Sequence, residues 1–427
     1  MDAARQDEIT DDYGGNFPRR NPQYSGFTPR AGASCAFLIV PFLETVPMPL
    51  RSSPSLRAAR RLLASFWWLI ALPAIADPAI DIEALKKARL DSGAPAMAAM
   101  VASANGTPVV RVDGVREMDQ PDAVTAGDRW HVGSVTKSMT STLVGRLIDQ
   151  GKLRFDATLT ELLPGMPMRD EYKRVTLLQL MQHRAGIVPL TRPSPDLGKT
   201  VDETAGSTRA KAAAAARWIL DQPPVAPPGS KMEYSNGGYA LIGHIVERTM
   251  NEDYRALMKR EVFVPLGMPS ADFGWPIDLA KDAPRGHGPG PSGMAPAPAA
   301  YRLPAHLDPA GNVSATLADL ARYLQAHLAA LKGSDKFLKP ETARTLHRIA
   351  EAGPQGGGYA CGWSVVPMPM AGTRHGHNGS AGTFYAEVAF IPEKDIVAAV
   401  VSNAPPQPNQ RPPVQSQLLR GLLTGAQ

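Results

Sequence analysis

The sequence has 427 residues, of which 44% are hydrophobic, 20% are charged and 6% are aromatic. This composition supports a sizeable core and argues against disorder over most of the chain. The formal net charge is +5, and residues 77–427 carry only +3 of it without a dense basic stripe, so we expect no nucleic-acid partner.

The residues before Asp77 predict an export signal. A basic stretch ends at Arg61, and the apolar run 62–76 closes in Ala-Ile-Ala, a small-x-small pattern. This is the layout of a secretory signal peptide, and 15 apolar residues are short for a bilayer span, which needs about 20. We therefore expect residues 48–76 to be a signal peptide cleaved after Ala76. An uncleaved anchor is the alternative.

The predicted signal peptide bears on the residues that precede it and on the location of the mature protein. Residues 1–47 are polar and dotted with Gly and Pro, and they predict a misannotated or disordered extension ahead of a true start at Met48. The mature protein is expected to be periplasmic or secreted, with no stable membrane span after cleavage. Of the two cysteines, only Cys361 lies in the mature part, where it suits packing better than chemistry.

The mature chain predicts β elements at both ends and a helical block between them. Apolar residues at helical spacing predict helices over 77–91, 134–149, 175–183, 209–220, 239–249, 317–331 and 413–424. Extended segments bounded by turn residues predict strands over 96–103, 108–112, 130–132, 359–366, 384–391 and 396–402. The Pro-, Gly- and Ala-rich stretch 283–310 predicts an irregular surface loop that borders a cleft.

These elements predict one domain over 77–427, of the α/β (α+β) class. An antiparallel β-sheet formed from about 77–133 and 356–427 would be flanked by helices. An all-helical part would occupy about 140–330.

A first motif, S-x-x-K, lies at the start of a predicted helix. Ser134 and Lys137 are three residues apart and therefore share a helix face. A buried lysine with a lowered pKa can remove the proton of a serine, and the Ser134 N–H at a helix start is free to donate to an oxyanion. A capping serine with a surface lysine is the alternative, because this pattern arises by chance about once in such a chain.

A second motif, Tyr234-Ser235-Asn236, follows a Pro-Pro-Gly turn in the helical block. The Tyr234 hydroxyl could relay protons to and from a serine or a leaving group. The Asn236 amide could orient a substrate carbonyl and hold a lysine. A loop tyrosine half buried by its ring is the alternative.

A third motif, His377-Asn378-Gly379-Ser380, lies at the start of a strand-like segment. Gly379 would let a substrate approach the backbone, and the Ser380 N–H could complete an oxyanion hole with that of Ser134. His377 offers a donor or a charge for a substrate carboxylate or for proton relay. A hairpin turn rich in Gly and Asn is the alternative.

With these motifs in this order, the chain resembles the serine β-lactamase-like, penicillin-binding superfamily. The resemblance is to the branch of class C β-lactamases, DD-peptidases, D-aminopeptidases and β-lactamase-like esterases. It runs from about Leu85 to Ser402 and includes VTLLQLMQHRAGI, PPGSKMEYSNGGYALIGHIVE and HGHNGSAGTFYAEVAFIP. It implies a β-lactamase/DD-peptidase-like fold with the site in the cleft between the sheet part and the helical part, and no metal or other cofactor.

The resemblance also implies roles for the motif residues. Ser134 would be the nucleophile, Lys137 its general base or proton shuttle, and Tyr234 a second proton-relay group. Asn236 would bind the acyl side chain, and residues 377–380 would contact the substrate. His377 stands where true β-lactamases usually have Lys, and a neutral histidine would hold a substrate carboxylate less firmly.

The expected function is a serine hydrolase that forms an acyl-enzyme on Ser134. An esterase, or a DD-peptidase- or D-aminopeptidase-like hydrolase of small esters or amides, ranks first. A β-lactamase and a non-catalytic relative that binds peptidoglycan or peptides are the alternatives. The expected partners are a small-molecule or peptide-like substrate, with peptidoglycan among the candidates. His183, in a predicted buried helix, is expected to be a core residue.

Overall fold

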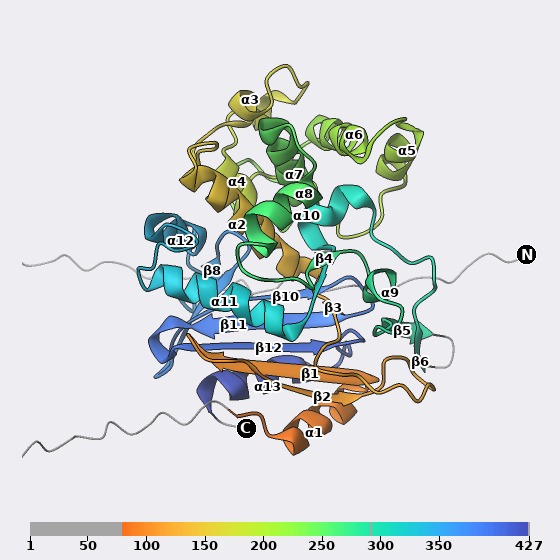
Figure 1. Ribbon diagram of the computed structural model, residues 1–427. Helices are drawn as coiled ribbons and strands as arrows, with labels where there is room; N and C mark the ends of the chain where they lie inside the picture. Colours follow the sequence, from red (N-terminus) through yellow and green to blue (C-terminus); the bar gives the residue numbers. More distant parts are fainter. Residues whose placement is uncertain (1–78, 291–292, 426–427) are drawn as a thin grey trace, which may run out of the picture. The chain divides into compact units, whose positions relative to one another are not determined.

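A seven-stranded antiparallel sheet is the framework of the molecule (Figure 1). The structure, a computed structural model, describes residues 79–290 and 293–425, so the expected signal peptide and the segment before it lie outside the described residues. The strand order is β2-β1-β12-β11-β10-β9-β8. The strands are β1 (Ala96–Ser103), β2 (Val109–Gly114), β8 (Gly358–Tyr359), β9 (Ser364–Met368), β10 (Gly372–Ser380), β11 (Tyr385–Ile391) and β12 (Ile396–Ser402).

The first strand and the last strand of the described chain pair in the middle of this sheet. Ser402 on β12 pairs with Met97 on β1 and with Tyr385 on β11, and both pairings are antiparallel. The predicted antiparallel sheet built from both ends of the chain is therefore confirmed.

Both faces of the sheet are covered, because alternate residues of each strand point to opposite sides. On one face, Met97 and Val400 pack with α1 (Ile82–Ser92) and α13 (Val414–Thr424). On the other face, the remaining strand residues join a larger core with α2 (Thr136–Asp149) and α11 (Leu317–Leu331). The three central strands β1, β11 and β12 consequently read as almost continuous apolar runs.

The helical block lies on the α2 side of the sheet (Figure 1). Its helices are α3 (Leu159–Leu162), α4 (Leu177–Met181), α5 (Pro195–Glu203), α6 (Thr208–Asp221), α7 (Asn236–Met250), α8 (Tyr254–Met258), α9 (Pro276–Leu279), α10 (Asp308–Gly311) and α12 (Pro340–Leu346). Ser207, Ser235 and Thr316 begin α6, α7 and α11 by accepting a backbone N–H of the first turn.

A second small sheet carries the predicted strand 130–132. Its order is β3 (Trp130–His131), β7 (Val313–Ala315) and β4 (Asp272–Phe273). The expectation that 130–132 joins the main sheet is therefore wrong. Trp130 pairs with Ala315 instead, so the chain leaves the main sheet before it reaches the first motif.

The stretch 283–310 is more ordered than an irregular surface loop, and that expectation is corrected. It contains the hairpin β5 (His287–Gly290) and β6 (Gly293–Pro296), and it ends at the start of α10. His287 anchors it: the side chain is fully buried and its Nε2 accepts the Met118 N–H at 3.0 Å. The Pro-, Gly- and Ala-rich composition of the stretch does not reveal this contact, because Met118 is distant from His287 in the sequence.

Two further expectations fail where the backbone turns. The expected strand 359–366 is split into β8 and β9 by a bend at Gly362, whose φ of 74° is left-handed. A Cβ at Gly362 would lie 2.6 Å from the Ser138 backbone, so the bend packs tightly on the start of α2. The expected helix 175–183 already ends at Met181, since His183 adopts a left-handed φ of 57°.

The third motif also has a different place from the one expected. It ends strand β10, which begins at Gly372, rather than starting a strand. Within the described part of the chain, no helix is both long and apolar enough to cross a bilayer.

Candidate active site

Ser134 lies where the small sheet passes into the helical block. It is the middle residue of a single 3₁₀ turn, Gly133–Val135, which runs directly into α2. Its side chain is partly exposed, whereas Lys137, one turn later, is completely buried. The two side chains meet as the motif predicts, with Lys137 Nζ 3.0 Å from Ser134 Oγ.

Lys137 is surrounded by acceptors that carry no charge. Its Nζ contacts Asn236 Oδ1 at 2.7 Å and the Ala310 carbonyl of α10 at 2.7 Å. Burial lowers the pKa of Lys137 well below its usual value. A neutral amine has two N–H groups and one lone pair. With the two N–H groups on Asn236 and Ala310, the lone pair is left for the Ser134 hydroxyl proton.

Aromatic rings cover the same amine. Nζ lies 4.8 Å from the ring centre of Tyr234 and 5.7 Å from that of Tyr239. A ring face attracts a cation, so these rings would stabilise the ammonium that forms once Lys137 takes a proton. Burial therefore keeps Lys137 neutral in the free enzyme, and the two rings stabilise its ammonium form during the short time in which it holds the serine proton.

Tyr234 and Asn236 are held at the start of α7. Ser235 caps the helix by accepting the Gly238 N–H at 2.9 Å, and Asn236 donates from Nδ2 to the Leu190 carbonyl at 2.9 Å. The Asn236 amide is thereby fixed with its oxygen toward Lys137. Burial raises the pKa of Tyr234, and hydrogen bonding with Ser134 partly opposes this rise. A phenol that stays protonated at neutral pH suits a proton donor.

Strand β10 sorts the third motif onto two faces. His377 and Gly379 are buried on the face toward α2, while Asn378 and Ser380 alternate to the other face and are exposed. The Asn378 side chain interacts with Tyr385 there, and Ser380 Oγ donates to the Phe384 carbonyl at 2.7 Å. The structure therefore does not bring the Asn378 side chain to Ser134, and Ser380 can contribute only its backbone N–H.

Two glycines bring the nucleophile turn against β10. A Cβ on Gly379 would lie 2.4 Å from the Ser134 amide nitrogen, and a Cβ on Gly133 would lie 2.6 Å from the Ser380 amide nitrogen. Only bare backbones can approach so closely. The amides of Ser134 and Ser380 consequently lie next to each other, as an oxyanion hole requires.

His377 is buried with both ring nitrogens in contact with the protein. Nε2 lies 3.1 Å from the Tyr359 hydroxyl, and Nδ1 lies 2.5 Å from the Asn378 carbonyl. Burial, together with the nearby Lys137, lowers the pKa of His377 to about 3. It is therefore a neutral group near neutral pH and carries no charge for a substrate carboxylate.

Sequence reasoning missed two side chains of this site. His183, expected to be a core residue, is buried with its ring 4.4 Å from that of Tyr234 and 4.9 Å from that of Tyr359. Tyr359 reaches His377 from the short strand β8. Neither lies in a catalytic motif, and the only signal for His183 was its place in the VTLLQLMQHRAGI segment.

A buried polar chain supports the nucleophile turn from behind. His131 Nδ1 accepts the Gly133 N–H at 3.3 Å, so Nε2 carries the proton and donates to Asn312 Oδ1 at 3.3 Å. Asn312 in turn donates to Asp308 at 2.6 Å, and Asp308 accepts from Arg255 at 2.6 Å. Such a chain fixes the backbone that presents Ser134.

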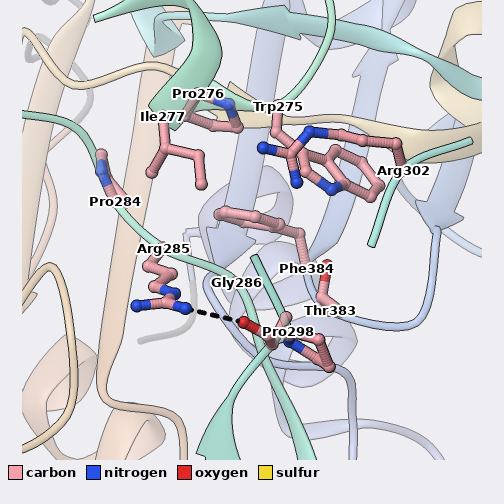
Figure 2. A pocket seen from close by; sticks show the side chains of 11 residues that line it. Trp275, Pro276, Ile277, Pro284, Arg285, Gly286, Pro298, Arg302, Thr383 and Phe384 are labelled. Atoms are coloured by element: carbon pink, nitrogen blue, oxygen red, sulfur yellow. Dashed lines mark hydrogen bonds between the residues drawn. The ribbon is translucent and has the colours of Figure 1, made fainter. Parts of the chain in front are cut away.

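A small pocket lies beside the β10–β11 turn, and one of its lining residues, Trp275, contacts His131. Figure 2 shows Trp275, Phe384 and Arg285 around it, with Arg285 donating to the Ala297 carbonyl at 3.0 Å. The Trp275 ring lies 3.8 Å from that of His131, edge to face. Trp275 thus fixes the histidine that holds the nucleophile turn.

Other groups offer less chemistry. Cys361 is fully buried, and burial raises the pKa of its thiol, so it is a poor nucleophile. Among the described residues, no three His, Cys, Asp or Glu side chains are grouped so that they could hold a metal ion.

Comparison with known proteins identifies the family of the chain. The family model described as Beta-lactamase matches residues 81–419. Penicillin-binding protein 4 of Amycolatopsis lactamdurans is 27% identical over 66% of this chain and 74% of its own length. A β-lactamase of Pseudomonas fluorescens is 24% identical over 68% of this chain and 83% of its own length.

Solved structures show the same fold at low identity. The octameric penicillin-binding protein homologue from Pyrococcus abyssi has a TM-score of 0.67 and 24% identity, and covers 81% of this chain and 78% of its own. A class C β-lactamase from Rhodobacter sphaeroides has a TM-score of 0.65 and 19% identity, over 80% of this chain and 97% of its own. The match over residues 81–419 shows that the chain belongs to the Beta-lactamase family, as a serine hydrolase of the β-lactamase and penicillin-binding superfamily.

Proposed function

We propose that the protein hydrolyses small esters or amides through an acyl-enzyme on Ser134, and that uncharged esters are its preferred substrates. One observation carries the proposal. Lys137 is completely buried among uncharged hydrogen-bond acceptors, and its Nζ lies 3.0 Å from Ser134 Oγ. Serine becomes a useful nucleophile only beside such a base.

The proposed reaction has two halves. Lys137 takes the Ser134 proton while Oγ attacks the acyl carbonyl, and the N–H groups of Ser134 and Ser380 bind the resulting oxyanion. Tyr234 gives a proton to the leaving alcohol or amine and regains one from the Lys137 ammonium, and the acyl group stays on Oγ. Water then attacks the carbonyl carbon of the acyl-enzyme and gives one proton to Lys137 or Tyr234. That proton is returned to Ser134 Oγ as the ester bond breaks, which releases the acid and free Ser134.

The preference for uncharged esters rests on His377. A β-lactam or a terminal D-Ala-D-Ala peptide carries a carboxylate close to the scissile bond. His377 is neutral and is held by Tyr359 and by the Asn378 carbonyl, so it offers such a carboxylate no charge. A neutral ester has no carboxylate, so its binding does not depend on a positive charge at this position.

The test follows the release of nitrophenolate from p-nitrophenyl acetate by stopped flow, with Ser134→Ala as the matched control. We expect a burst of one equivalent per protein in the wild type and none in the variant. Nitrocefin and a D-Ala-D-Ala peptide, run beside the ester, should give a lower kcat/KM. Identical traces for wild type and variant would contradict the proposal and favour a binding protein for peptidoglycan or peptides.

We also propose that the protein is exported, on the sequence of residues 48–76 alone. N-terminal sequencing of the mature protein from a Gram-negative host should begin at Asp77. A cytoplasmic product that begins at or before Met48 would contradict export.

A further inference from the structure

His183 brackets Tyr234 with two hydrogen bonds. Its carbonyl accepts the Glu233 N–H at 2.8 Å, and its ring Nδ1 accepts the Ser235 N–H at 3.1 Å. The residues on both sides of Tyr234 are thus tied to the same histidine. The left-handed backbone at His183, with φ 57°, turns the carbonyl and the ring toward one segment.

The ring also contacts Tyr234 directly. Its centre lies 4.4 Å from the Tyr234 ring centre, at a tilt of 43°. Because Nδ1 accepts a hydrogen bond, the proton of the neutral imidazole is on Nε2, which is buried without a hydrogen-bond partner among the described residues. His183 therefore serves no other polar group of the described chain with that nitrogen, and its polar contacts converge on the Tyr234 segment.

We propose that His183 is a positioning residue for Tyr234: it holds the phenol where protons pass between Ser134 and the leaving group. This inference rests on the proposed function, because it assigns a role within the same acylation step. His183 acts through Tyr234 and does not contact the reacting atoms. A displacement of the phenol by about 1 Å would slow proton transfer by about tenfold to a hundredfold.

Three single variants separate this role from a general packing role. His183→Leu removes the acceptor of the Ser235 N–H. His183→Asn restores an acceptor oxygen close to the position of Nδ1, and Asn tolerates a left-handed φ. Tyr234→Phe removes the phenol. Ser134→Ala gives the baseline, and p-nitrophenyl acetate is the substrate for all of them.

We expect His183→Leu to lower the burst rate constant about tenfold to a hundredfold with KM changed less than about threefold. His183→Asn should stay within about threefold of the wild type. In the Tyr234→Phe background, His183→Leu should have no further effect, because the group through which it acts is gone. If circular dichroism shows that His183→Leu does not fold, His183→Ala takes its place in the cycle.

Two results would overturn the inference while leaving the proposed function intact: equal losses in His183→Leu and His183→Asn, or a full His183→Leu effect in the Tyr234→Phe background. A burst that survives in Ser134→Ala is a different failure. It overturns the proposed function, and the role of His183 with it.

Discussion

Gly379→Ala should abolish efficient acylation while the protein stays folded. The added Cβ would lie 2.2 Å from the Val132 carbonyl oxygen and 2.4 Å from the Ser134 amide nitrogen, and real Cβ atoms do not approach closer than 3.0 Å. The nucleophile turn and β10 must therefore separate by about 0.8 Å, which moves the Ser134 and Ser380 amides apart. Loss of one oxyanion donor lowers kcat by about 10²–10³-fold, or about 3–4 kcal/mol.

Gly376→Ala provides the matched control on the same strand. Its Cβ would lie 2.7 Å from the Val388 carbonyl oxygen, so this variant also creates a backbone clash, which is milder than at Gly379 and lies away from Ser134. Both variants should lose about 1–3 kcal/mol of unfolding free energy, measured in urea. Only Gly379→Ala should lose the nitrophenolate burst. A folded Gly379→Ala protein that acylates within threefold of the wild type would refute the proposed oxyanion hole.

Three further predictions follow from the same contacts. Lys137→Met should slow acylation about 10²–10⁴-fold and lower stability by about 1–3 kcal/mol, because Asn236 Oδ1 loses its buried donor. His377→Lys should raise kcat/KM for nitrocefin relative to p-nitrophenyl acetate about tenfold to a hundredfold, because a charged hydrogen bond to the carboxylate contributes about 1.5–3 kcal/mol. Acidification should also destabilise the fold. His327, His347 and His375 form a buried cluster in the core, in which His327 Nδ1 lies 3.0 Å from His347 Nε2 and the ring centres of His347 and His375 are 4.9 Å apart. We expect a lower urea midpoint at pH 5 than at pH 7.5.

The sign of the acid effect follows from the histidine cluster. Burial lowers the pKa of His327 to about 3 and that of His375 to about 4, and it lowers the pKa of His347 as well. The pKa of histidine in an unfolded chain is near 6.5. Between pH 6.5 and about pH 4, these histidines are therefore protonated in the unfolded chain and remain neutral in the folded chain. The contribution of His327 and His375 to stability is fully present above pH 6.5 and falls by about 2 kcal/mol for each of these two residues at pH 5.

Clear outcomes would contradict these three predictions. A Lys137→Met protein that still gives a burst would remove lysine from its proposed role. An unchanged ratio of nitrocefin to ester turnover in His377→Lys would show that the charge of this residue does not set the substrate class. Equal urea midpoints at pH 7.5 and pH 5 would show that the histidine cluster is not kept neutral.

The local sequence pattern predicted an element correctly where the residues of that element themselves determine which of its faces is buried. Strand β1 and helix α11 have the bounds that their apolar spacing predicts, and β12 does as well. The meeting of Ser134 with Lys137 could also be predicted, because three residues of helix bring two side chains onto one face. The resemblance to a known superfamily added the partnership with Tyr234 and Asn236.

Other features of the site depend on residues distant in the sequence. The acceptor at Ala310 comes from the end of a stretch that reads as a loop, and His183 comes from a helix that ends two residues early. Tyr359 lies on a strand interrupted at Gly362 by contact with α2. No short-range pattern encodes such contacts.

The sequence by itself determined the apolar periodicity, the order of the elements and the residue types that can carry acyl-transfer chemistry. Only the tertiary structure decided which residues outside the motifs join the site and which motif side chains turn away from it. The period of two along β10 turns His377 and Gly379 toward Lys137 and turns the side chains of Asn378 and Ser380 away. Which side chains point toward Lys137 depends on which face of β10 packs against α2. Tertiary contacts between distant parts of the chain determine that face.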